Sequence, residues 1–158
     1  MQNKEVHSIF NDTMLDGISK TDLTIIKTES GSIFHAIKNT DAGFREFGEV
    51  YFSTVIKDAV KAWKLHQKMT LNLIVPVGSV LFCFVDMRSN SNTYNETYKI
   101  VLSQEAYCRL TVPPGIWFGF KGISDGLNMI CNVADIPHDP NEVMRKDVDE
   151  INMDWSIK

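Results

Sequence analysis

The sequence predicts an all-β fold, a jelly-roll barrel or sandwich with short peripheral helices. Three observations support this prediction: short alternating or β-branched runs recur along the chain, turn-forming residues separate them, and helical periodicity is almost absent. No internal repeat, low-complexity run or linker divides the 158 residues. We therefore expect one domain over 1–158, with residues 1–19 at its periphery.

The expected strands follow one another with turns between them. Two apolar runs, 71–77 and 80–85, are separated only by Gly78 and Ser79, and this pattern predicts a hairpin. Pro140 and the acid after it predict the start of a helix over 140–145. The remaining strand-like runs are 21–30, 32–37, 49–56, 98–102, 107–112, 116–120 and 127–133.

Composition and charge restrict the classes of function. With 44% hydrophobic and 23% charged residues, the chain can bury a core. A net charge of -4 argues against a nucleic-acid partner, since such proteins are usually basic. No stretch has the composition of a membrane span or a signal peptide, so we expect no membrane association. Cys83, Cys108 and Cys131 lie singly in apolar runs, which indicates free thiols in a reducing cytoplasm.

The first candidate site lies on the stretch 63–68. If this stretch is a strand, Lys64, His66 and Lys68 point to one face. Two neighbouring cations disfavour protonation of an imidazole, so His66 would be a neutral base. The same cations would attract a phosphate or a developing enolate. The alternative interpretation is two solvated lysines and a surface histidine.

Two further groups accompany this stretch. Asp86 ends an apolar run and Arg88 follows it, either as an ion pair that stabilises the next loop or as an acid held in the mouth of a barrel, where ligands bind. Trp117 and Phe118 follow a Pro-Pro-Gly turn and supply planar apolar surface, for the core or for a ligand.

A metal site is not expected. The four histidines are scattered singly, without a His-x-His pair or a cysteine pair at ligand spacing.

Four motifs occur in an order that resembles a known family. They are Leu-His at 65–66 after a strand, V-D-M-R-S-N-S-N-T-Y at 85–94, V-P-P-G-I-W-F-G-F at 112–120, and P-H-D-P-N-E at 137–142 with a closing segment at 151–155. Together they resemble the dTDP-4-dehydrorhamnose 3,5-epimerase family of cupin-like jelly rolls. The likeness covers roughly 25–155 and is strongest to a divergent subgroup found in surface-polysaccharide clusters.

The resemblance implies proton abstraction beside the keto group of a nucleotide-linked 4-keto-6-deoxyhexose, without a cofactor. In the family a histidine removes the proton, a lysine stabilises the enolate and a tyrosine returns a proton on the opposite face. Carried over, His66 matches the base and Asp86 the acid of the V-D-x-R motif. It also implies a homodimer formed through exchanged N-terminal strands. The substrate-binding residues that we expect are Lys64, Lys68, Arg88, Asn72, Trp117, Phe118 and Asn132.

Several family residues have no counterpart by position. Leu71 and Asn72 stand where the lysine is expected, no tyrosine lies near 131–132, and Phe118 replaces a histidine. The carboxylate that orients the base is expected beyond the terminal tryptophan motif. A nucleotide-sugar epimerase or isomerase that inverts one carbon or tautomerises is therefore our prediction. An inactive sugar-nucleotide-binding or scaffold protein is the alternative, and a metal-dependent cupin is a weaker third.

Overall fold

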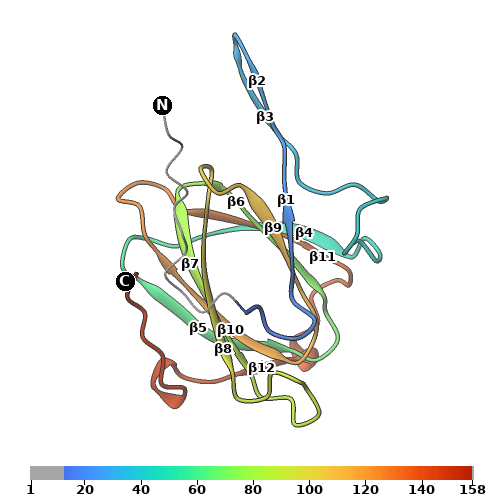
Figure 1. The fold of residues 1–158 in the computed structure, drawn as a ribbon, viewed down its shortest axis with the longest axis vertical. Helices are drawn as coiled ribbons and strands as arrows, with labels where there is room; N and C mark the ends of the chain where they lie inside the picture. The colour runs from blue at the N-terminus through green and yellow to red at the C-terminus, as the bar shows by residue number, and fades with distance from the viewer. Residues whose placement is uncertain (1–12, 158) are drawn as a thin grey trace.

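Two antiparallel five-stranded sheets form the body of the computed structural model, which describes residues 13–157 (Figure 1). The first sheet has the order β1 (Ser19–Asp22), β9 (Cys108–Val112), β6 (Leu71–Val77), β11 (Met129–Ala134) and β4 (Glu49–Thr54). The second has the order β12 (Val143–Arg145), β5 (Val60–His66), β10 (Ile116–Gly122), β7 (Ser79–Asp86) and β8 (Thr97–Ser103). The predicted all-β jelly roll is confirmed.

The predicted hairpin over 71–85 is wrong. β6 pairs with β9 and β11, whereas β7 pairs with β8 and β10, so the chain passes from one sheet to the other at Gly78. Gly78 has a φ of 77°, and a Cβ on it would lie 2.3 Å from the carbonyl oxygen of Leu127. Only glycine fits such a crossing.

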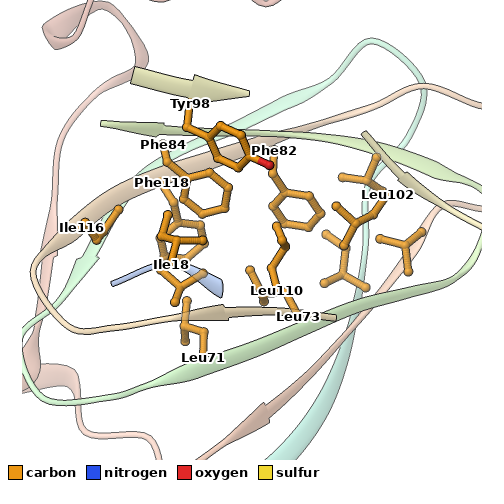
Figure 2. Close-up of a cluster of buried hydrophobic side chains, with 14 of the residues drawn as sticks. Ile18, Leu71, Leu73, Phe82, Phe84, Tyr98, Leu102, Leu110, Ile116 and Phe118 are labelled. Carbon is orange, nitrogen blue, oxygen red and sulfur yellow. The ribbon is translucent and has the colours of Figure 1, made fainter. Parts of the chain in front are cut away.

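The main core fills the space between the sheets (Figure 2). Because side chains alternate along a strand, Phe82 and Phe84 of β7 point inward together with Phe118 of β10. Leu71 and Leu73 of β6 pack against them from the first sheet. The inner faces of β6 and β7 therefore build one core, although these strands are not paired.

A second cluster covers the outer face of the second sheet. The intervening residues of β7, including Cys83, pack there with Trp63 and Ile151. Trp155 adds its ring at 5.2 Å from the ring of Trp63. This cover explains why β7 is a continuous apolar run, since it is buried on both faces.

Two terminal predictions need correction. The stretch 1–19 was expected to be peripheral; its residues 1–12 lie outside the described residues, but Leu15 and Ile18 are buried in the main core. The helix predicted over 140–145 is a 3-10 turn, η1 (Pro140–Glu142), followed by strand β12. Val143 pairs with His66 there, and tertiary pairing overrides the local helix signal. A second turn, η2 (Val148–Glu150), follows.

A two-stranded arm, β2 (Ile25–Thr28) and β3 (Gly31–Phe34), projects away from the barrel (Figure 1). Its side chains Ile26 and Ile33 are exposed. The three cysteines are buried free thiols. No helix in the described part of the chain is long and apolar enough to cross a membrane.

Candidate active site

A cavity of about 640 Å³ lies between the two sheets. This volume suits a small organic ligand. The first sheet contributes Tyr51, Ser53 and Asn132 to its lining, with aliphatic side chains between them. The second sheet contributes mainly cationic and aromatic groups, among them Lys61, Lys64, Phe118 and Arg145. The same side also carries Asp147 and Glu150, so its cations outnumber its acids and this wall is positively charged on balance, whereas the other wall is neutral.

His66 ends β5 next to this cavity, although its own side chain is not part of the lining. It is buried at 7% exposure, and its ring stacks on that of Phe118, a lining residue, with 6.0 Å between centroids. Its Nδ1 lies 2.5 Å from Oε1 of Glu142. In the neutral imidazole the carboxylate favours the tautomer in which Nδ1 carries the proton, so Nε2 is the ring nitrogen that can accept one. This arrangement makes His66 a base of defined orientation.

Glu142 is buried and held on both oxygens. Its Oε2 accepts a hydrogen bond of 3.0 Å from the backbone N–H of Lys68, just beyond β5. Burial acts to raise the pKa of Glu142, but the hydrogen bonds from His66 and from the backbone of Lys68 outweigh it and hold that pKa below its ordinary value. The carboxylate thus stays ionised, and it stabilises the imidazolium that forms when His66 takes a proton.

Sequence reasoning missed this role of Glu142. The orienting carboxylate was expected after the terminal tryptophan motif, but in the structure η1 supplies it. The available signal was the acid at the end of the P-H-D-P-N-E motif. It could not be used without the pairing of β12 with β5, which places Val143 opposite His66.

Lys64 lies two residues before His66 and faces the cavity. Its cross-strand partner is Arg145 of β12. Burial, followed by the charges of Arg145 and Lys61, lowers the pKa of Lys64. Like charges directly opposite each other on a sheet destabilise it, and a bound anion would relieve this repulsion. The cationic wall is therefore suited to an anionic ligand.

Asn132 and Tyr51 form the opposite wall. They are cross-strand partners on β11 and β4. The Asn132 Oδ1 accepts a hydrogen bond of 3.1 Å from the backbone N–H of Asn72, which fixes the amide orientation. Its Nδ2 then donates a hydrogen bond of 3.1 Å to Oη of Tyr51. Sequence reasoning missed Tyr51, because nothing local to 49–56 shows that β4 pairs with β11.

Asp86 performs a structural task. It is fully buried at the end of β7 and accepts hydrogen bonds from Arg88, Ser91 and Thr93. Burial acts to raise the pKa of Asp86, but these three partners outweigh it and hold that pKa far below its usual range. Among the described residues, the cavity lining includes neither Asp86 nor Arg88. The ion pair stabilises the loop after β7, so the prediction of both residues in the pocket needs correction.

Three other predicted residues point away from the cavity. Lys68 lies beyond the end of β5, and its side chain is exposed. Asn72 alternates with the inward Leu71 and Leu73, so its amide faces outward and bonds Gly43 and Thr111. Trp117 alternates with Phe118 and belongs to the outer cluster. Lys64, Phe118 and Asn132 are the predicted substrate-binding residues that line the cavity.

In the part of the chain that the structure describes, no group of three His, Cys, Asp or Glu side chains could hold a metal ion.

A family model described as dTDP-4-dehydrorhamnose 3,5-epimerase matches residues 33–158. The chain belongs to this family. This result confirms the resemblance of the ordered motifs. A dTDP sugar isomerase from Desulfovibrio desulfuricans G20 is 34% identical, with a TM-score of 0.86 over 90% of this chain and 94% of that chain.

Two proteins of lower sequence identity are also similar to this chain. The spore coat polysaccharide biosynthesis protein SpsL of Bacillus subtilis (strain 168) is 20% identical over 149 residues, which are 92% of this chain and 99% of that protein. The sugar 3,4-ketoisomerase QdtA from Thermoanaerobacterium thermosaccharolyticum, solved in complex with TDP, is 22% identical with a TM-score of 0.70 and covers 84% of this chain and 90% of that chain. At 22% identity, the similarity to QdtA shows a shared fold only.

Proposed function

We propose that this member of the dTDP-4-dehydrorhamnose 3,5-epimerase family is a nucleotide-sugar epimerase or isomerase. It acts on a 4-keto-6-deoxyhexose by removing a proton beside the keto group, in the biosynthesis of a surface polysaccharide. The observation that carries this proposal is the 2.5 Å contact of His66 Nδ1 with Glu142 beside the cavity. The 34% identical dTDP sugar isomerase and the polysaccharide-biosynthesis relative support the substrate class.

His66 is the general base in this proposal. A ketone acidifies the neighbouring C–H bond, so the reaction needs no cofactor, and Nε2 takes the proton. General-base catalysis of this kind contributes about 10²–10⁴-fold. The negative charge of Glu142 stabilises the resulting imidazolium across the 2.5 Å contact. The base and its carboxylate thus work as one unit.

Lys64 is the group that stabilises the enolate. The family lysine is expected where Leu71 and Asn72 stand, and neither can supply a positive charge. Lys64 shares the inward face of β5 with His66 and lines the cavity. A preorganised cation aimed at a developing oxyanion stabilises the transition state more than the ground state.

Arg145 of the same wall binds the diphosphate of the substrate. It lines the cavity and is exposed, whereas the ammonium of the neighbouring Lys146 lies over the ring of Trp117 and is paired with Glu150. A guanidinium at this position can bind two phosphate oxygens at once. We place the reaction in the cytoplasm, where Cys83, Cys108 and Cys131 would remain reduced thiols.

The alternative of an inactive sugar-nucleotide-binding protein was motivated by missing catalytic helpers. Glu142 supplies one of them, and a histidine that only contacts a ligand needs no buried carboxylate to fix its tautomer. The residues therefore favour the enzyme.

A homodimer completes the proposal. The β2–β3 arm projects from the barrel with Ile26 and Ile33 exposed, and β4 ends the first sheet with Val50 and Phe52 exposed. A bare sheet edge is a template for a strand of another chain. We propose that the arm of each copy packs on the sheet of its partner.

The experiment that tests the proposed function is proton exchange. A dTDP-linked 4-keto-6-deoxyhexose is incubated with the wild-type protein in D₂O, and deuterium beside the keto group is followed by NMR. Enzyme-dependent incorporation is expected. If no sugar of a panel incorporated deuterium at protein concentrations that bind it, the protein would be an inactive sugar-nucleotide-binding protein rather than an enzyme.

A further inference from the structure

An epimerase must return a proton to the face of the sugar opposite its base. His66 and Lys64 belong to the second sheet, so the donor for that face must come from the first sheet across the cavity. The carboxyl groups at the rim, Asp147 and Glu150, follow β12 and lie on the side of β5. They therefore share the side of the base.

The first sheet turns two hydroxyl groups toward the cavity within the described residues, those of Tyr51 and Ser53. A phenol gives up its proton to an enolate far more readily than an aliphatic hydroxyl does. The side-chain amide of Asn132, which also lines this wall, has no acidic proton to donate. Tyr51 is therefore the strongest proton donor on this wall.

We propose that Tyr51 is the general acid that protonates the enolate on the face opposite His66. This inference rests on the proposed function. In the step, the electron pair of the enolate forms a C–H bond with the phenolic proton, and the O–H bond of Tyr51 breaks to leave a phenolate. His66 holds the proton removed from the substrate, so the total charge is conserved. After product release His66 loses its proton to water and Tyr51 regains one.

The hydrogen bonds of the wall prepare Tyr51 for this task. Oη of Tyr51 accepts from Nδ2 of Asn132, so the proton of the phenol remains available to donate. The same hydrogen bond stabilises the phenolate after transfer. The backbone N–H of Asn72 holds Oδ1 of Asn132 in place, so the amide cannot rotate and present its oxygen to Tyr51 instead. Asn132 is a positioning residue for the acid.

Exposure and location agree with this role. Tyr51 is 41% exposed, so water can reach it and restore its proton between turnovers. β4 is an edge strand, next to β11 in the first sheet. The acid reaches the cavity from the strand adjoining the one that carries Asn132, which explains why no tyrosine is needed at 131–132.

The inference predicts a specific stereochemical outcome. With a base from the second sheet and an acid from the first, the carbon that loses its proton is reprotonated from the opposite face and its configuration inverts. Without Tyr51, His66 can only return a proton to the face from which it came. Exchange with solvent would then continue with retention of configuration.

The test compares Tyr51→Phe with the wild type in D₂O, using a dTDP-linked 4-keto-6-deoxyhexose, and scores deuterium incorporation and inversion separately by NMR. Tyr94→Phe is the matched control, because Tyr94 is an exposed tyrosine in the loop after β7. We expect Tyr51→Phe to lose inversion by on the order of 100-fold while exchange persists. Asn132→Ala should show the same split to a smaller extent.

Each other outcome overturns a different claim. Inversion by Tyr51→Phe at the wild-type rate contradicts the inference while leaving the proposed function intact. Equal loss of exchange and inversion also contradicts it, because Tyr51 would then serve binding or folding rather than protonation. Absence of exchange in the wild type overturns the proposed function itself, and the inference falls with it.

Discussion

Glu142 binds the imidazole of His66 with one carboxylate oxygen, at 2.5 Å from Nδ1, and the backbone N–H of Lys68 with the other. The base and the chain that follows it are thus tied to the same side chain. This relationship makes the orientation of His66 independent of any ligand. It also leads to the first prediction.

Glu142→Gln should lower kcat by on the order of 100-fold with little change in KM. The amide keeps the size of the side chain but cannot stabilise an imidazolium by charge. The rate of deuterium exchange measures this effect, and near-UV circular dichroism verifies the fold. Glu105→Gln, at an exposed glutamate, is the control. A kcat within twofold of the wild type would show that the contact does not serve the base.

Arg145→Ala should raise KM for the nucleotide sugar by about 10-fold, the value of one charged hydrogen bond, and leave kcat nearly unchanged. Arg145 lies opposite Lys64 and its charge contributes to the lowered pKa of Lys64. The variant should also reduce the salt dependence of binding, which titration calorimetry at two ionic strengths would detect. Arg45→Ala serves as control, since Arg45 precedes β4 outside the cavity lining of the described residues. An unchanged KM would remove Arg145 from the diphosphate site.

Asp86→Asn should destabilise the fold by about 2 kcal/mol or more, because Asp86 is fully buried and Arg88 would lose its charged partner. This loss of stability is smaller than that expected for a fully buried ion pair, because the Arg88 side chain is 25% exposed. Urea unfolding measures the difference. At a temperature where the variant is folded, its kcat should stay within a few-fold of the wild type. A large loss of kcat in the folded variant would restore Asp86 as a catalytic acid.

The same substitution changes the response to acid. The pKa of Asp86 in the folded protein lies far below its unfolded value, so its contribution to stability is complete above the unfolded value near pH 4 and is lost as pH falls below it. Glu142 has a lowered pKa as well and acts in the same direction. The free energy of unfolding of the wild type should therefore fall more steeply between about pH 5 and pH 2 than that of Asp86→Asn. Parallel pH profiles would contradict the ion-pair interpretation.

Sedimentation velocity should give the mass of two chains for the wild type at micromolar concentration. Ile33→Asp places a charge on an exposed apolar position of the arm and should shift the protein toward the monomer. Lys27→Asp, on the neighbouring strand of the arm, is the control for the added negative charge, because this position is already polar. A monomeric wild type would contradict the proposed exchange of arms.

The sequence predicted the strands because their apolar periodicity and turn chemistry are local. It did not predict the partners of β6 and β7, since a run buried on both faces has no alternation that assigns it to a sheet. His66 was found because a histidine between lysines has a local signature. Asn72 and Trp117 were placed on the wrong face, because each lies one residue from an inward neighbour.

Glu142 and Tyr51 were missed for a different reason. Glu142 lies 76 residues from His66, and Tyr51 lies 81 residues from Asn132. Only the pairing of β12 with β5 and of β4 with β11 brings these side chains to the cavity. Such contacts depend on topology and cannot be derived from local spacing.

The most direct test concerns His66 itself. His66→Asn is compared with His138→Asn, an exposed histidine before η1, for deuterium incorporation beside the keto group of a dTDP-linked 4-keto-6-deoxyhexose. His66→Asn should bind the sugar nucleotide but lose exchange by at least about 100-fold, while His138→Asn exchanges at the wild-type rate. Exchange at the wild-type rate in folded His66→Asn would show that another group removes the proton.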